Sequence, residues 1–184
     1  MVRSRASGRV LGVGMAFAAA IGAGFLVPES AFAATTCSAP PGSPVDLVQI
    51  EGDDACGAST DGTAGAWSYG ERGVGFADAR LGAQVGAAGF DGGVGAGEST
   101  SGRLLAVGLG SGALALGVLE QPGTALVVAG PESQAFVGDA DDPVLCEGSV
   151  AGAFDLEAVR GCVVLGDFSY VTPGAQTPSS AELP

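Results

Sequence analysis

Residues 101–123, "SGRLLAVGLGSGALALGVLEQPG", are the most apolar stretch beyond the first 33 residues. The apolar part, 104–119, is too short to cross a bilayer as a helix, and four glycines weaken its helix propensity. In "ALALGVL" (113–119), Leu and Val alternate with Ala and Gly, which is the two-residue period of a β-strand. A glycine pattern at 110–115, "GSGALA", resembles a nucleotide-binding loop but has no helical pattern after it. The stretch therefore predicts two consecutive strands joined at 108–112.

The same spacing continues on both sides of this stretch. From about Gly75, segments of about ten residues begin with small or apolar residues and end in turn formers, with boundaries near 83–92, 93–102, 103–112, 113–123, 124–133 and 134–143. Short strands at this spacing predict an all-β fold, either a β-solenoid or β-roll, or an antiparallel meander that closes into a sandwich or barrel. The small side chains favour the solenoid, because they let backbone layers approach closely.

Three other segments carry local predictions. "VDLVQI" (45–50) is typical of a strand, and the acidic, Gly-rich stretch 51–65 is typical of a loop. One short C-terminal helix is expected at "LEAVR" (156–160), with Asp155 as its cap and Gly161 as its end.

The first 33 residues have the pattern of a signal peptide. Arg3, Arg5 and Arg9 precede an apolar run, 10–27, and Ala31-Phe32-Ala33 is an A-x-A cleavage signal, so the mature chain is expected to begin at Ala34. An uncleaved anchor is the alternative, because 10–27 is just long enough to span a bilayer. Residues 34–171 are then one domain, with no membrane span after cleavage, and the polar tail 172–184 is expected to be disordered.

The four cysteines all lie in the predicted mature part. An even number of cysteines in an exported chain predicts disulfides, with three possible connectivities for four cysteines. Cys37–Cys56 and Cys146–Cys162 are favoured, because each closes a short loop at one end of the domain and contributes roughly 3 kcal/mol. The absence of His and of any C-x-x-C pair argues against zinc.

Charge limits the partners of the protein. Residues 34–184 contain four arginines and nineteen carboxylates, a net charge of −15, which would be repelled by nucleic acids and by anionic membranes. Without His or Lys, the chain lacks Ser-His-Asp and Cys-His catalysis and Schiff-base chemistry. An envelope protein or a glycan remains as the expected partner.

Three weaker site hypotheses remain. Asp139, Asp141 and Asp142 form an acidic turn that offers oxygen ligands to Ca²⁺, as do Glu51, Asp53 and Asp54, whereas no other cofactor is expected. A hydrolase would need two carboxylates with separated pKa values, and the candidates are Asp78, Asp91, Glu98, Asp155 and Asp167. Trp67, Tyr69, Phe168 and Tyr170 would line a sugar site or, more commonly, belong to the core.

The composition of the whole chain also carries a resemblance. The chain lacks Lys and Asn and has only Ile21 and Ile50, which indicates a GC-rich genome. Together with the signal-like start, this make-up resembles that of small, uncharacterised secreted proteins of actinobacteria with domains of unknown function. The leading hypothesis is an exported, non-enzymatic structural or interaction protein of the cell envelope or the medium. The alternatives are a secreted hydrolase that uses paired carboxylates, or a weak calcium-binding module.

Overall fold

The fold consists of two β-sheets packed face to face. A computed structural model describes residues 34–138 and 144–173, all within one compact unit, and shows no helix among them. Sheet A holds eight strands in the spatial order β1 (Thr35–Ala39), β4 (Gly65–Glu71), β6 (Gln84–Phe90), β8 (Arg103–Leu109), β10 (Thr124–Ala129), β13 (Val150–Asp155), β14 (Arg160–Leu165) and β15 (Phe168–Val171). Sheet B holds seven, in the order β12 (Val144–Glu147), β11 (Gln134–Val137), β9 (Leu114–Leu119), β7 (Val94–Ser99), β5 (Val74–Ala79), β3 (Asp54–Thr60) and β2 (Val45–Glu51).

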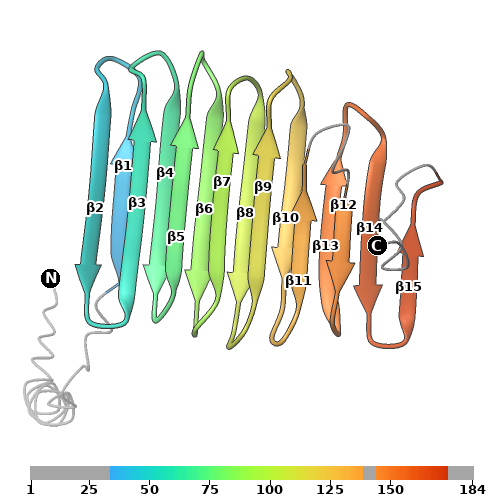
Figure 1. The fold of residues 1–184 in the computed structure, drawn as a ribbon. Coiled ribbons are helices and arrows are strands. Elements are labelled where there is room, and N and C mark those ends of the chain that lie inside the picture. Colours follow the sequence, from blue (N-terminus) through green and yellow to red (C-terminus); the bar gives the residue numbers. More distant parts are fainter. Residues whose placement is uncertain (1–33, 139–143, 174–184) are drawn as a thin grey trace, which may run out of the picture. The chain divides into compact units, whose positions relative to one another are not determined.

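The chain winds between the two sheets as a β-solenoid. From β3 to β11, consecutive strands alternate between sheets B and A, and from β5 onward each pairs in parallel with the strand one coil earlier (Figure 1). In sheet A, Gly65 pairs with Gln84, Gln84 with Arg103 and Arg103 with Thr124. Two ten-residue segments therefore make one coil, and the solenoid prediction is confirmed.

Small side chains fill the space between the sheets. In β9, Ala115 and Gly117 point inward and are buried, whereas Leu114, Leu116 and Val118 lie on the outer side and are only half-buried. The sheets approach so closely at Gly95 in β7 that a Cβ there would meet the carbonyl oxygen of Ala88 and lie 2.6 Å from that of Ala106. The alternation of large and small residues thus places mostly small residues inside, with Leu104, Leu119 and Val127 among the larger side chains buried there.

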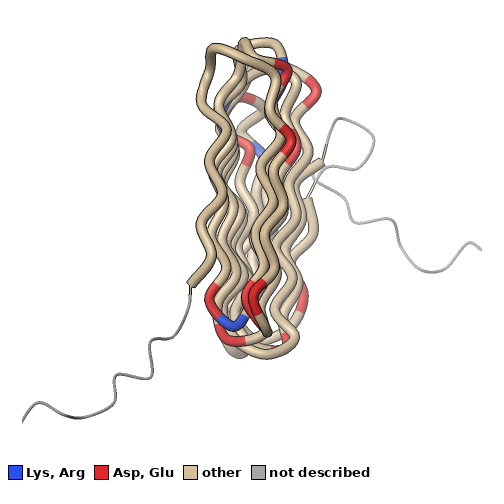
Figure 2. The backbone as a smooth tube through the Cα atoms, turned by 90° about the vertical axis from the view of Figure 1, so that its left-hand side faces the viewer, with Lys and Arg blue, Asp and Glu red and all other residues tan. Residues whose placement is uncertain are grey.

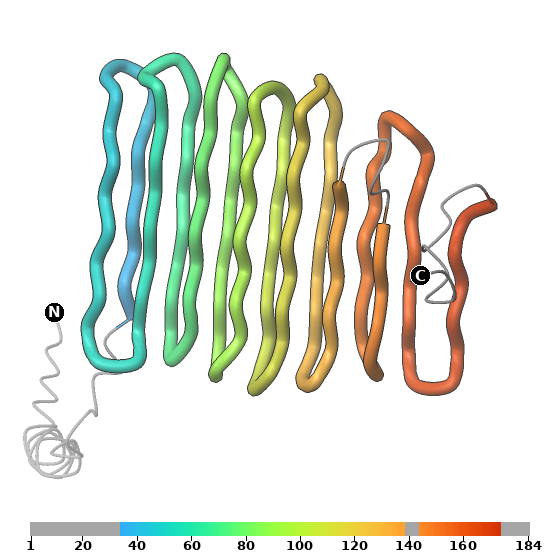
Figure 3. The backbone as a smooth tube through the Cα atoms, viewed as in Figure 1, coloured from blue at the N-terminus to red at the C-terminus, as the bar shows by residue number. Residues whose placement is uncertain are grey.

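Antiparallel strands close both ends of the solenoid (Figure 3). β1 and β2 pair antiparallel with β4 and β3, and at the other end β12 pairs with β11, while β13, β14 and β15 continue sheet A beyond β10. Each end carries one disulfide between the sheets: Cys37 is bonded to Cys56, and Cys146 to Cys162. These are the two pairings that the sequence favours.

Two local predictions are wrong. Residues 156–159 form a turn between β13 and β14 rather than a helix, and Gly161 continues into β14. The Asp155 carboxylate does accept hydrogen bonds from the backbone N–H groups of Glu157 and Ala158, but these cap a single turn, because strand pairing resumes at Arg160. The stretch 51–65 is no simple loop either, since it contains β3, whose small residues pack inside the solenoid.

The turns of successive coils are linked by side chains. Asp61 accepts hydrogen bonds from the backbone N–H of Leu81, in the next coil, at 2.7 Å and from the N–H and hydroxyl of Thr63 at 2.8 Å. These hydrogen bonds lower the pKa of Asp61 from 3.8 to about 2, and the bond from Leu81 contributes most. On the opposite edge, the Arg72 guanidinium pairs with Asp91 of the next coil. Figure 2 shows that charged residues gather toward the two ends of the strands.

We expect Gly95→Ala to destabilise the fold strongly, because the new methyl group would press against backbone of the opposite sheet, which cannot rotate away. Overpacking of this kind costs about 3 kcal/mol in the free energy of unfolding, measured from urea denaturation. Gly86→Ala is the matched control, because its methyl group would meet the movable Cδ1 of Leu105, 3.1 Å away on the outer face. Equal stability of the two variants would contradict the close approach of the sheets.

We expect Asp61→Asn to reduce the acid sensitivity of the fold. Folding lowers the pKa of Asp61 from 3.8 to about 2, so its carboxylate stabilises the fold above about pH 4, and this stabilisation is lost as the pH falls toward 2. The variant should melt at a lower temperature at pH 7 and lose less of its melting temperature between pH 4 and pH 2. Parallel melting curves for the two proteins over this interval would contradict the assignment.

Candidate functional site

The outward side of sheet A, called face A below, is covered with apolar side chains in three rows that run across the strands. The register of the strands aligns them. One row contains Trp67, Leu105, Leu126 and Phe154. The middle row contains Tyr69, Val107, Val128, Val163 and Tyr170. The third row contains Phe90, Leu109, Val150, Leu165 and Phe168. Nine of these fourteen side chains are more than a third exposed, which is unusual for large apolar residues on a folded surface.

Glycines on the same and on neighbouring strands let the large side chains lie flat on this face. The Phe154 ring lies over Gly161 and Gly152, since a Cβ on these glycines would be 2.6 Å and 3.3 Å from ring atoms of Phe154. In the same row, Leu105 and Trp67 flank Gly86. Rings that cover in-register glycines fill gaps between strands, so face A is even rather than ridged.

Aromatic rings gather at both ends of face A. Tyr69 lies between Trp67 and Phe90, with ring centroids 6.4 Å and 5.3 Å away. The Tyr69 hydroxyl donates a hydrogen bond to Glu71 at 3.0 Å, and this bond raises the pKa of Tyr69. Phe168 and Tyr170 lie on β15, six strands from β4 in sheet A. The structure therefore does not join the four predicted aromatic residues in one sugar site, and the expectation that they belong to the core is wrong.

Among the described residues, charged side chains lie only at the margins of face A. Glu71 ends β4 at one margin, and Arg103 begins β8 at the opposite one, beside Gln84 and Thr124. The three apolar rows lie between them. Seven strands, spaced about 4.8 Å apart and each about 20 Å long, give face A an area of roughly 650 Å².

The outward side of sheet B, called face B below, is apolar but carries an acidic row. Its large side chains include Val74 and Phe76, which are 39% and 41% exposed, and Leu116. The register places Asp46, Asp78 and Glu98 in one line across β2, β5 and β7, with Ser59 of β3 between the first two. Face B thus differs from face A by this line of carboxylates.

Two of the predicted hydrolase carboxylates, Asp78 and Glu98, are direct neighbours. They pair in register on adjacent strands, and Asp78 also accepts a hydrogen bond from the Arg80 guanidinium at 2.8 Å. Both lie on the open side of sheet B, away from the pocket that Asp155 lines and from the hollows beside Arg103. Of the other candidates, Asp91 pairs with Arg72, and Asp167 lies in the exposed turn before β15.

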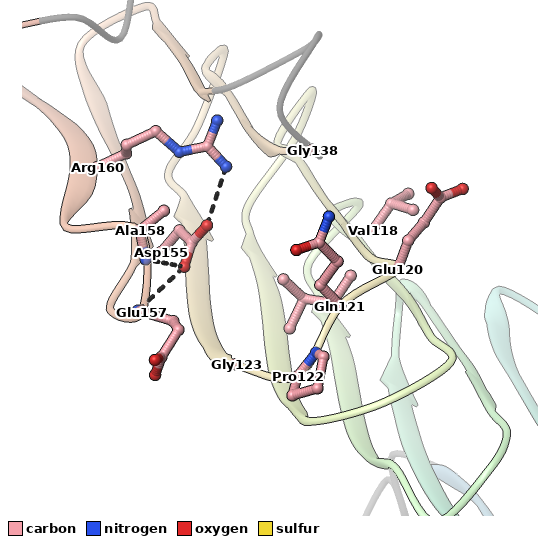
Figure 4. A pocket seen from close by; sticks show the side chains of 11 residues that line it. Val118, Glu120, Gln121, Pro122, Gly123, Gly138, Asp155, Glu157, Ala158 and Arg160 are labelled. Carbon is pink, nitrogen blue, oxygen red and sulfur yellow. Dashed lines mark hydrogen bonds and ion pairs between the residues drawn. The ribbon is translucent and has the colours of Figure 1, made fainter.

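Asp155, the fifth candidate, lines a pocket of about 380 Å³ at one edge of the sheets (Figure 4). Its carboxylate pairs with Arg160 at 2.9 Å and also holds the turn at 156–159. Glu120, Gln121 and Pro122 form part of the opposite wall. Because Asp155 is already bonded to a cation and to two N–H groups, its arrangement is that of a structural residue.

The calcium hypothesis is largely untested by the structure. Asp139, Asp141 and Asp142 lie outside the described residues, so this site remains a prediction. In the second acidic segment, Asp54 is buried and accepts a hydrogen bond from the backbone N–H of Arg72, while Glu51 and Asp53 are exposed. Within 34–138 and 144–173, no three acidic or cysteine side chains are grouped closely enough to hold a metal ion.

Comparison with known proteins places the chain in a family. A family model described as a family of unknown function (DUF6764) matches residues 2–165. The chain belongs to this family. No curated protein and no solved structure matches the chain. Among the described residues, no helix is long and apolar enough to cross a membrane. The description of the family names no activity, so the function has to be inferred from the geometry.

Proposed function

We propose that the protein is an exported, non-enzymatic interaction module of the cell envelope or the medium, in which a rigid solenoid presents flat apolar faces to partners. The observation that carries this proposal is face A, where most large side chains point outward while alanine and glycine fill most of the interior. Its roughly 650 Å² exceeds the largest apolar patch of a typical monomer, about 300–600 Å². Patches of this size mark interaction sites.

The arrangement of the described carboxylates supports a non-enzymatic role. Asp91 pairs with Arg72 of the neighbouring coil, Asp155 pairs with Arg160 across its own turn, and Asp61 links two coils. These groups therefore hold the solenoid together. An envelope protein or a glycan is the partner class that the acidic charge and the apolar faces favour.

Export is supported by the sequence of residues 1–33 and by the two disulfides. The basic start, the apolar run and the A-x-A site fit a signal peptide, although these residues lie outside the described part. Disulfides persist in oxidising compartments, and both join the two sheets at the ends of the solenoid.

We expect the protein recovered from its host to begin at Ala34. N-terminal sequencing or intact mass measurement of protein from the medium and from the envelope fraction would test this. Ala33→Arg should block cleavage, because the site requires a small residue there, and should leave the longer form in the membrane fraction. An unprocessed wild-type chain in the cytosol would contradict export.

We expect cross-linking of a tagged protein in its host to capture a reproducible partner in the envelope fraction. Replacing Leu105, an exposed residue of face A, and Phe76, an exposed residue of face B, by Ser in separate variants would show which face the partner contacts. Free protein in the medium without any partner would contradict the proposal. So would hydrolysis of an envelope glycan that Glu98→Gln abolishes, which would instead assign the Asp78–Glu98 pair to catalysis.

A further inference from the structure

We propose that face A is the interface of a homodimer, in which two copies of the chain pack sheet A against sheet A about a two-fold axis. This inference rests on the proposed function, since it names the occupant of one of the two interaction faces. Two apolar sheets packed face to face form a β-sandwich layer about 10 Å thick, a common arrangement of β-proteins. A two-fold axis makes the same patch serve both partners, so a single self-complementary face is sufficient.

The size of face A fits a dimer. A stable protein interface buries about 800 Å² of accessible surface on each partner. The footprint of face A, roughly 650 Å², is close to this size. The flatness described above also matters, since Phe154 and Trp67 lie over glycines rather than projecting from the face. Two even faces can then meet along most of their area.

Charge selects face A over face B as the self-associating face. Each copy carries a net charge of −15 over residues 34–184. Two copies joined through face B would bring together two acidic rows, each with Asp46, Asp78 and Glu98. Two copies joined through face A would bury uncharged rows and leave Glu71 and Arg103 at the rim. The same charge disfavours an anionic lipid surface as the occupant.

The dimer would have a defined functional consequence. With both copies of face A buried, the two copies of face B point in opposite directions. The assembly would then be bivalent toward a partner that recognises face B, and bivalence strengthens binding without any new contact.

The first test is sedimentation equilibrium of the purified protein at micromolar concentrations, together with the emission of Trp67. Trp67 is the only tryptophan, is 44% exposed and lies on face A, so dimerisation should shift its emission to the blue and reduce its quenching by acrylamide. Both signals should follow the same concentration dependence. Added NaCl should strengthen the dimer, because it screens the repulsion between two acidic copies.

The matched variants are Leu126→Glu on face A and Val74→Glu on face B, both at positions 39% exposed. Leu126→Glu should weaken dimerisation by at least about tenfold, because it buries an unpaired charge, whereas Val74→Glu should leave the affinity unchanged. Unchanged circular dichroism and melting temperature would show that both variants fold.

Three results would overturn the dimer. These are a monomer at every concentration, a dimer that Val74→Glu dissociates and Leu126→Glu does not, and a monomer whose Trp67 emission shifts only on neutral lipid vesicles. A monomer that still captures an envelope partner through either face would overturn the dimer alone and leave the proposed function intact. A dimer without any envelope partner would support the dimer and overturn the proposed function.

Discussion

The close approach of the two sheets is the constraint on which the rest of the structure depends. At Gly95, backbone atoms of the opposite sheet occupy the space that a side chain would need, and buried alanines such as Ala87 and Ala106 keep the interior thin elsewhere. A thin interior buries little area for each residue, so packing alone stabilises the solenoid weakly. The parallel ladders, the linked turns and the two disulfides supply what the core lacks.

The same constraint produces the outer faces. Because mostly small side chains fit inside, most large residues of the alternating pattern are directed outward, as Leu114 and Leu116 show in β9, whereas Leu104 and Val127 are among the few that pack inside. The two faces then differ by charge: acidic residues line face B, whereas those near face A stand at its margin. The interaction surfaces are therefore a direct result of how the interior is packed.

Much of the fold could be predicted from the sequence, because turn residues recur every ten positions and set the length of each strand. The exposed faces could have been found too, since a strand whose small residues must face a close partner directs Leu and Val outward. The strand β3 was missed because Ala55, Cys56 and Gly57 have the composition of a loop, and pairing with β2 and β5 overrides that composition. The helix at 156–160 was wrong because Asp155 caps a single turn as well as it caps a helix.

The sequence does not show which carboxylates lie side by side. Asp78 and Glu98 become neighbours only because β5 pairs with β7, while β6, which lies between them in the sequence, belongs to the other sheet. The inward direction of the small residues is the central claim, and hydroxyl-radical footprinting of the dilute protein tests it most directly. Phe76 and Val74 should be oxidised readily, while Leu104 and Val127 should be protected. Protection of Phe76 and Val74 together with oxidation of Leu104 would mean that the strands turn their opposite side to solvent, which would contradict the account.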